Sequence, residues 1–143
     1  MSTNWFQDIY DMHAKFGVHD WVQSKLNEKD RETLKAFLEF RVKCITEEYE
    51  EMQEAFAAGD PEEFVDALID MMVFAIGTLE VFGVDANKAW SEVHRANMDK
   101  TPGVKESRPN PLGLPDLIKN PGWQGPVHSE NWGILDALLE KSG

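Results

Sequence analysis

Cysteine is almost absent from this chain, since Cys44 is the only one in 143 residues. An intramolecular disulfide is therefore excluded, and a lone thiol suits a reducing compartment. The first residues lack the basic segment and apolar run of a secretory leader. The most apolar stretch, residues 67–84, carries Asp70 and Glu80 and is too interrupted for a membrane span. We therefore expect a cytoplasmic protein with no membrane partner.

Positive charge is also scarce, because 14 Lys and Arg face 26 Asp and Glu, giving a net charge of −12. Such a chain repels nucleic-acid backbones, so we expect no nucleic-acid partner. An acidic protein can still act on a polyphosphate if metal ions screen the meeting of negative charges. The length suits one domain with a real core and is short for two domains.

Proline is missing from most of the chain, since Pro61 is the only one before residue 102. The other six of the seven are Pro102, Pro109, Pro111, Pro115, Pro121 and Pro126. We therefore expect a helical domain over residues 1–100 and an extended Pro-rich arm over 101–143. Apolar residues should anchor the arm on its own domain or on a neighbouring subunit, and a short helix is expected near 131–140.

Apolar residues recur every three and four positions, which predicts helices over residues 4–16, 30–58, 61–82 and 86–98. Gly17 and Gly59 offer helix ends, and Asp60 with Pro61 is typical of a helix start. Residues 18–30 are expected to form a polar connector. No stretch alternates convincingly at period two, so the predicted class is all-α, a four-helix bundle with the arm attached.

Five acidic residues fall at helical spacing on two neighbouring predicted helices: Glu47, Glu48 and Glu51 on the first, Asp66 and Asp70 on the second. Asp66 and Asp70 project from one face of an otherwise apolar segment. Like charges one turn apart repel, and an unpaired buried carboxylate is costly. A divalent cation with oxygen ligands would remove both problems.

The short connection around Gly59 forces these two helices into an antiparallel hairpin, which brings the two acidic groups level. Because no Cys or His accompanies the acids, the ion should be Mg²⁺ or Mn²⁺. The alternative is that the acids line a narrow solvated stripe. A glutamate-rich helix alone is usually such a face, but Asp66 and Asp70 are harder to explain in that way.

Three stretches resemble the all-α nucleoside triphosphate pyrophosphohydrolases, which include MazG proteins, phosphoribosyl-ATP pyrophosphohydrolases and dimeric dUTPases. They are Glu47-Glu48-Tyr49-Glu50-Glu51-Met52, Val65-Asp66-Ala67-Leu68-Ile69-Asp70, and residues 90–100, which end in an N-x-x-K pattern. The resemblance covers roughly residues 34–100 and implies a MazG-like bundle. The tail, from Arg108-Pro109-Asn110-Pro111 to Gly122-Trp123, resembles bacteriophage-type members, which implies the host cytoplasm.

The second motif departs from the family pattern ExxD, because Ala67 stands three residues before Asp70. Either Asp66 takes the role of the missing glutamate, or Glu63-x-x-Asp66 is the motif and Asp70 is additional. We favour Asp66 and Asp70, since Asp70 lies deeper in the apolar segment. Glu63 then has no assigned role.

The resemblance implies hydrolysis of a (d)NTP to the monophosphate and pyrophosphate. It implies metal ligation by Glu48, Glu51, Asp66 and Asp70, a catalytic or second-ion role for Glu47, and substrate binding by Asn97 and Lys100. A deoxynucleotide such as dGTP or dUTP is the expected substrate. Base contacts are expected from helix one and the residues after it; the candidates are His13, Lys15, Phe16 and Trp21.

The predicted helices carry more apolar surface than a monomer can bury, so we expect a homodimer or, by resemblance, a homotetramer. Two other classes stay open at this point. One is a non-catalytic helical regulator that binds nucleotide or metal, and the other is an oligomerisation module with solvated acids.

Overall fold

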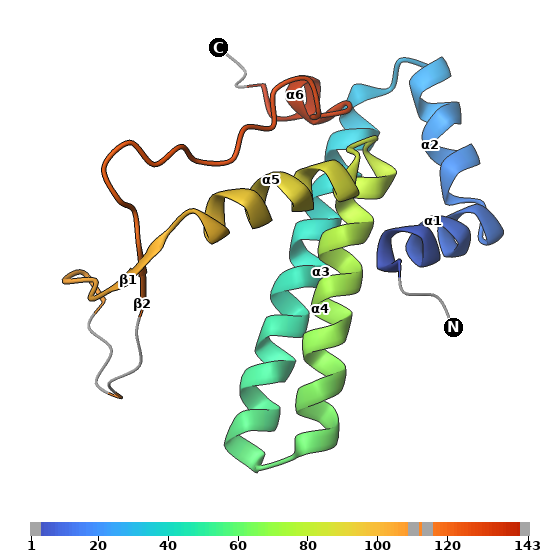
Figure 1. Ribbon diagram of the computed structural model, residues 1–143. Coiled ribbons are helices and arrows are strands. Elements are labelled where there is room, and N and C mark those ends of the chain that lie inside the picture. Colours follow the sequence, from blue (N-terminus) through green and yellow to red (C-terminus); the bar gives the residue numbers. More distant parts are fainter. Residues whose placement is uncertain (1–3, 109–111, 113–115, 141–143) are drawn as a thin grey trace. The chain divides into compact units, whose positions relative to one another are not determined.

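The computed structural model describes residues 4–108, 112 and 116–140, and is mostly helical, which confirms the all-α class (Figure 1). The chain divides into two compact units, Met1–Ala86 with Trp132–Gly143, and Asn87–Asn131. The expected boundary at residue 100 remains a prediction. Among the described residues no single helix is long and apolar enough to cross a membrane; only the helices Pro61–Val81 and Ala86–Met98 together, across the bend between them, reach that length and composition.

The first unit contains five of the helices seen in the described residues. They are α1 (Trp5–Lys15), α2 (Val18–Asn27), α3 (Arg31–Ala58), α4 (Pro61–Val81) and the short α6 (Leu135–Leu138). The second unit contains α5 (Ala86–Met98) and the strands β1 (Thr101–Gly103) and β2 (Asp116–Ile118).

The long α3 and α4 run antiparallel, side by side, and form the hairpin that the sequence predicts (Figure 1). Gly59 ends α3 in the left-handed conformation, with φ of 66°. Asp60 begins α4, because its side chain accepts a hydrogen bond from the Glu63 backbone N–H at 3.1 Å. A turn this tight fixes which residues of the two helices come level.

The predicted polar connector over residues 18–30 is wrong, since most of it is the helix α2. Gly17, with φ of 77°, turns the chain between α1 and α2. Val22 is 6% exposed and belongs to the core. The segment is mostly polar, but it carries a narrow apolar stripe, and burial of that one face is enough to stabilise the helix.

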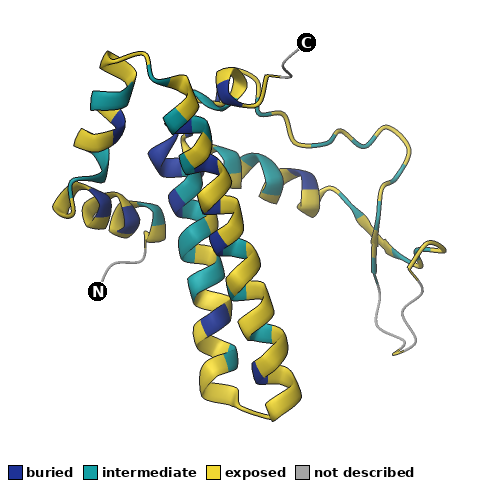
Figure 2. Ribbon diagram, turned by 180° about the vertical axis from the view of Figure 1, so that it is seen from behind, coloured by how far each residue is buried: buried dark blue, intermediate teal, exposed yellow. Residues whose placement is uncertain are grey.

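The hydrophobic core lies where α3 begins and α4 ends, away from the Gly59–Asp60 turn. Its buried members are Val22, Leu34, Leu38, Val81, Phe82 and Leu138. The short helix α6, which falls inside the predicted range 131–140, supplies Leu138, and the Ile134 N–H donates to the Phe82 carbonyl at 2.9 Å. Figure 2 shows that the half of the hairpin near its turn is largely exposed.

In the second unit, part of the Pro-rich arm folds back on α5. β1 and β2 pair antiparallel, with Pro102 opposite Leu117, a small ribbon that the sequence did not predict. The Trp123 indole N–H donates to the Ala96 carbonyl of α5 at 2.7 Å. Trp123 therefore anchors this part of the arm on α5.

Gly77, inside α4, allows a close approach from two other elements of the first unit. A Cβ atom at this position would collide with the Arg41 guanidinium and lie 3.2 Å from the His13 ring. Glycine inside a helix costs about 0.5–1 kcal/mol relative to alanine. Gly77 thus leaves room for the Arg41 guanidinium, which is buried against α4.

We expect Gly77→Ala to lower the free energy of unfolding by about 1–3 kcal/mol, despite the better helix propensity of alanine, because Arg41 and His13 must move. Urea unfolding followed by circular dichroism measures this change. The exposed Ala75→Gly variant calibrates propensity alone. A Gly77→Ala protein more stable than the wild type would show that the approach is not constraining.

Candidate metal centre between α3 and α4

Four carboxylates from two helices act on one another across the hairpin, with Glu48 and Asp70 partly buried and Glu51 and Asp66 exposed. Glu48 and Glu51 come from α3, and Asp66 and Asp70 come from α4. Glu48 and Asp70 lie at nearly equal sequence distances from the Gly59–Asp60 turn, which places them level on the two helices. We call these four residues the carboxylate cluster.

Glu48 is the most perturbed member of the carboxylate cluster, because its pKa is raised to about 7. Removal from water is the largest cause, followed by a hydrogen bond with Glu51 and the charge of Glu51. The charges of Asp70 and Asp66 raise it further. The raised pKa shows that the negative charges of both helices converge on this one side chain.

The Glu48 Oε2 atom is buried and has no hydrogen-bond partner within the described part of the chain. A buried acceptor without a donor is costly, and native proteins rarely leave one. A hard divalent cation, which takes carboxylate oxygens as ligands, would satisfy it and neutralise its neighbours. The chemistry of these carboxylates therefore suits such an ion.

Asp70 has the same character on the opposite helix. Burial raises its pKa most, and the charges of Asp66 and Glu51 and a hydrogen bond with Asp66 add to the effect. Ala67, the departure from the family pattern, is 1% exposed. The carboxylate that acts on Asp70 from the same helix belongs to Asp66, one residue before Ala67.

Glu47 and Glu63, the other two acids weighed from the sequence, are both exposed. The charge of Glu47 acts on the buried Cys44 thiol, where it adds to burial in raising the thiol pKa. Glu63 lies in the first turn of α4, where the helix dipole favours an acid.

Asn97 and Lys100, the predicted substrate ligands, lie in the second unit. Asn97 is exposed at the end of α5, and the Lys100 backbone N–H donates to its carbonyl at 3.2 Å. The Lys100 Nζ lies 5.3 Å from the centre of the Trp123 ring, and the Lys119 Nζ lies 4.9 Å from it. Both lysines are therefore held against the same aromatic ring.

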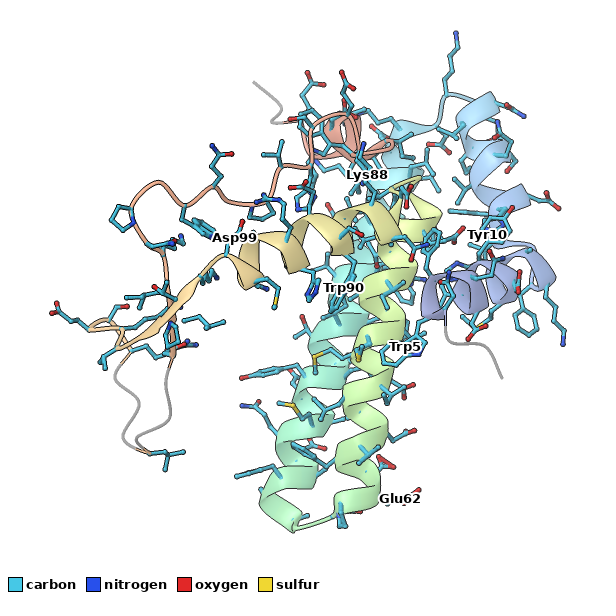
Figure 3. All side chains as sticks on the ribbon, viewed as in Figure 1. Trp5, Tyr10, Glu62, Lys88, Trp90 and Asp99 are labelled. Carbon is cyan, nitrogen blue, oxygen red and sulfur yellow. The ribbon has the colours of Figure 1, made fainter. Side chains whose placement is uncertain are left out.

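An apolar pocket of about 320 Å³ opens between α1 and α4 in the first unit. It is lined by Trp5, Asp8, Ile9, Ile69, Met72, Val73 and Ile76. Trp5 projects from the start of α1 toward α4 (Figure 3). Sequence reasoning missed this pocket, although Trp5 and Ile9 share one face of a predicted helix.

The four predicted base contacts do not gather around this pocket. Trp21 packs against Phe37, with ring centres 5.1 Å apart. His13 is buried against Glu80, and Phe16 is 70% exposed. The pocket lies instead beside Ile69, the residue next to Asp70 of the carboxylate cluster.

Comparison with known families shows that a model of the phosphoribosyl-ATP pyrophosphohydrolase family matches residues 17–97, more than half of the chain. This range includes the carboxylate cluster and Asn97. A comparison with curated proteins finds none that matches the chain.

The raised pKa of Glu48 predicts a specific pH dependence of stability in the presence of a chelator. Native Glu48 keeps its proton to about pH 7, whereas the unfolded residue loses it near 4.5. Between these values the native state binds more protons, so its stability falls as pH rises and then levels off. Glu48→Gln has no such group to titrate. Its stability should therefore rise relative to the wild type as the pH increases from about 4.5 to about 7.

Urea unfolding of both proteins at several pH values between 4 and 8, as a rough range around the two pKa values, measures the difference. Glu39→Gln, at an exposed position within α3, is the matched control, and its free energy of unfolding should change with pH in parallel with the wild type. If the free energies of unfolding of Glu48→Gln and the wild type differed by the same amount at every pH, the convergence of charge on Glu48 would be contradicted.

Proposed function

Because the chain belongs to the phosphoribosyl-ATP pyrophosphohydrolase family of MazG-like all-α enzymes, we propose that it is a metal-dependent (d)NTP pyrophosphohydrolase. The family hydrolyses a nucleotide phosphoanhydride and is typically dependent on divalent metal. For this chain the proposed products are the nucleoside monophosphate and pyrophosphate. The observation that carries the proposal is the unpartnered, buried Glu48 Oε2 among three further carboxylates.

Glu48, Glu51, Asp66 and Asp70 are the residues that would hold the ion, which we propose to be Mg²⁺ or Mn²⁺. When bound, such an ion neutralises phosphate charge and lowers the pKa of a bound water. The four side chains supply only oxygen, which favours these hard ions over Zn²⁺. Two helices packed against each other hold the ligands without a flexible loop.

Glu47 is the proposed catalytic residue because it lies next to a ligand on α3 yet remains exposed. A carboxylate there can accept a proton from the attacking water or orient it toward the phosphorus. Asn97 and Lys100 follow the family's N-x-x-K pattern and are proposed to bind the phosphates or the sugar. Lys100 would offset charge that develops on the leaving pyrophosphate.

The apolar pocket between α1 and α4 is the proposed place for the base. Trp5 offers an aromatic face on which a base could stack, and Met72 offers a polarisable wall. Ile69 connects the pocket to the carboxylate cluster through its neighbour Asp70. The proposed substrate is a deoxynucleotide such as dGTP or dUTP.

We further propose a homodimer or homotetramer. Several large apolar side chains of the hairpin are exposed in the single chain: Phe40, Val42, Tyr49, Phe56, Val65, Leu68, Ile69 and Met72. Large exposed apolar areas are typical of surfaces that bind another protein. A second copy of the hairpin would cover part of these side chains through a self-complementary contact.

Asp70→Asn should lower kcat by about a hundredfold or more while the fold persists, because it removes a ligand charge but keeps the side-chain shape. Released pyrophosphate, measured with Mg²⁺ and a panel of NTPs and dNTPs, reports this. Asp20→Asn, at an exposed position of α2, is the control and should retain full activity. If Asp70→Asn kept the kcat of the wild type, the assignment of Asp70 as a metal ligand would be refuted.

Lys100→Ala should raise KM for the triphosphate by about tenfold, since it removes a positive charge from the proposed phosphate site. Lys119→Ala is the matched control because it removes the other lysine that packs on the Trp123 ring. If both variants raise KM equally, the effect comes from packing on Trp123 and Lys100 has no separate role.

The same panel separates the proposed enzyme from the two other classes. An enzyme releases pyrophosphate only with Mg²⁺ or Mn²⁺ and prefers one base. A regulator binds nucleotide or metal in calorimetry without releasing product, and a structural module does neither.

A further inference from the structure

A second group of metal-ligating side chains lies in the first unit, apart from the carboxylate cluster. It contains His13 from α1, His19 from α2 and Glu80 from α4. His13 Nδ1 lies 2.5 Å from Glu80 Oε2, and His19 Nε2 lies 2.5 Å from Glu80 Oε1. We call these three residues the His–Glu–His cluster.

The Glu80 carboxylate is buried, because only 4% of its side chain is exposed. The His13 side chain is 5% exposed and the His19 side chain 29%. A buried carboxylate is costly unless a cation or several donors compensate it. Both of its oxygens therefore face an imidazole nitrogen, and neither is left unpaired.

The charge of Arg41 acts on Glu80, but the hydrogen bonds of Arg41 go to other groups. Its Nε donates to Thr78 Oγ1 at 3.0 Å, and an Nη donates to the Phe74 carbonyl at 3.3 Å. Its charge attracts Glu80 at longer range, which raises the Arg41 pKa and partly offsets the lowering by burial. Arg41 therefore neutralises part of the Glu80 charge without occupying its oxygens.

We propose that the His–Glu–His cluster binds a divalent ion of the Zn²⁺ class, with His13 Nδ1, His19 Nε2 and Glu80 as ligands. Two imidazole nitrogens and one carboxylate form a ligand set that Zn²⁺ accepts, with a fourth position left for water. All the ligand atoms lie within 4.8 Å of one another. The partly exposed His19 leaves a path by which the ion can enter.

The geometry needs only a small adjustment to take the ion. Ligand atoms around a tetrahedral Zn²⁺ lie roughly 3.4 Å apart, because each bond is about 2.1 Å long. Each histidine must therefore withdraw from Glu80 by about 1 Å, and ligand atoms that are now as much as 4.8 Å apart must approach one another. Tyr10 lies on α1 (Figure 3), and the centre of its ring is 4.6 Å from the centre of the His19 ring.

The two clusters select different ions. The carboxylate cluster gathers charge and oxygen, which suits Mg²⁺ or Mn²⁺. The His–Glu–His cluster carries one carboxylate and stands near the Arg41 cation, so charge alone does not favour a divalent ion there. Binding must come from the imidazole nitrogens, and these prefer Zn²⁺ or Co²⁺ to Mg²⁺.

An ion at this site would join three helices of the chain that pack on one another. α1, α2 and α4 would be held through one ligand each, beside the buried Gly77 and Arg41. Because the unfolded chain has no such arrangement, binding free energy would become folding free energy. The proposed role is structural and does not depend on the proposed hydrolysis.

Cobalt spectroscopy tests the site. The chelator-treated protein is saturated with Mg²⁺ to fill the carboxylate cluster, and Co²⁺ is then added. Four-coordinate Co²⁺ with nitrogen ligands absorbs strongly in the visible range, whereas six-coordinate Co²⁺ with oxygen ligands absorbs weakly. We expect one strongly absorbing Co²⁺ per chain, which Zn²⁺ displaces and Mg²⁺ does not.

His19→Ala should weaken the strongly absorbing Co²⁺ site by more than about tenfold, because it removes one of three ligands. His94→Ala removes an exposed histidine outside the cluster and is the matched control, with an unchanged spectrum. Glu80→Gln, which keeps the shape of the side chain, provides a second test if His19→Ala fails to fold.

Weak absorption in the wild type, or strong absorption that His19→Ala or Glu80→Gln leaves intact, would overturn the proposal. The three residues would then form a hydrogen-bonded contact only. Because the readout is absorption by Co²⁺ in the presence of Mg²⁺, it is independent of pyrophosphate release. The proposed hydrolase activity can thus be refuted while this metal site is confirmed, and the reverse is also possible.

Discussion

Repulsion between carboxylates on two packed helices is the constraint on which the structure of this protein depends. Glu48 and Glu51 on α3 meet Asp66 and Asp70 on α4, and burial together with their mutual charge raises the pKa of Glu48 to about 7. A protein evolved for stability alone would not place four acids in this position. The cluster costs stability in the free chain and becomes favourable only when positive charge enters it, which is the behaviour expected of a binding site.

The rest of the first unit compensates for that cost. The core of Val22, Leu34, Leu38, Val81, Phe82 and Leu138 lies at the end of the hairpin away from its turn. The Asp60 cap and the left-handed Gly59 fix the turn itself, so the register of α3 against α4 is set from both ends. The carboxylates are thus placed by rigid elements, and the exposed apolar residues along the hairpin remain available to a second chain.

Local rules predicted the long helices, because Gly59, Asp60 and Pro61 leave few alternatives at the hairpin turn. The same turn made the convergence of Glu48 and Asp70 predictable. Residues 18–30 were misjudged, since tertiary burial of Val22 decides that segment and its polar composition does not. The pairing of His13 and His19 with Glu80 joins three elements distant in sequence, so spacing alone could not reveal it. A lone glutamate in an apolar helix was the available indication.

Direct titration with Mn²⁺ tests the central claim, namely that the carboxylate cluster is a cation site. Electron paramagnetic resonance reports free Mn²⁺ and therefore counts the bound ions. The account predicts saturable binding that strengthens as pH rises through about 7, where Glu48 gives up its proton, and that Glu48→Gln weakens. Absence of binding at millimolar Mn²⁺, or binding indifferent to pH and to Glu48→Gln, would contradict it.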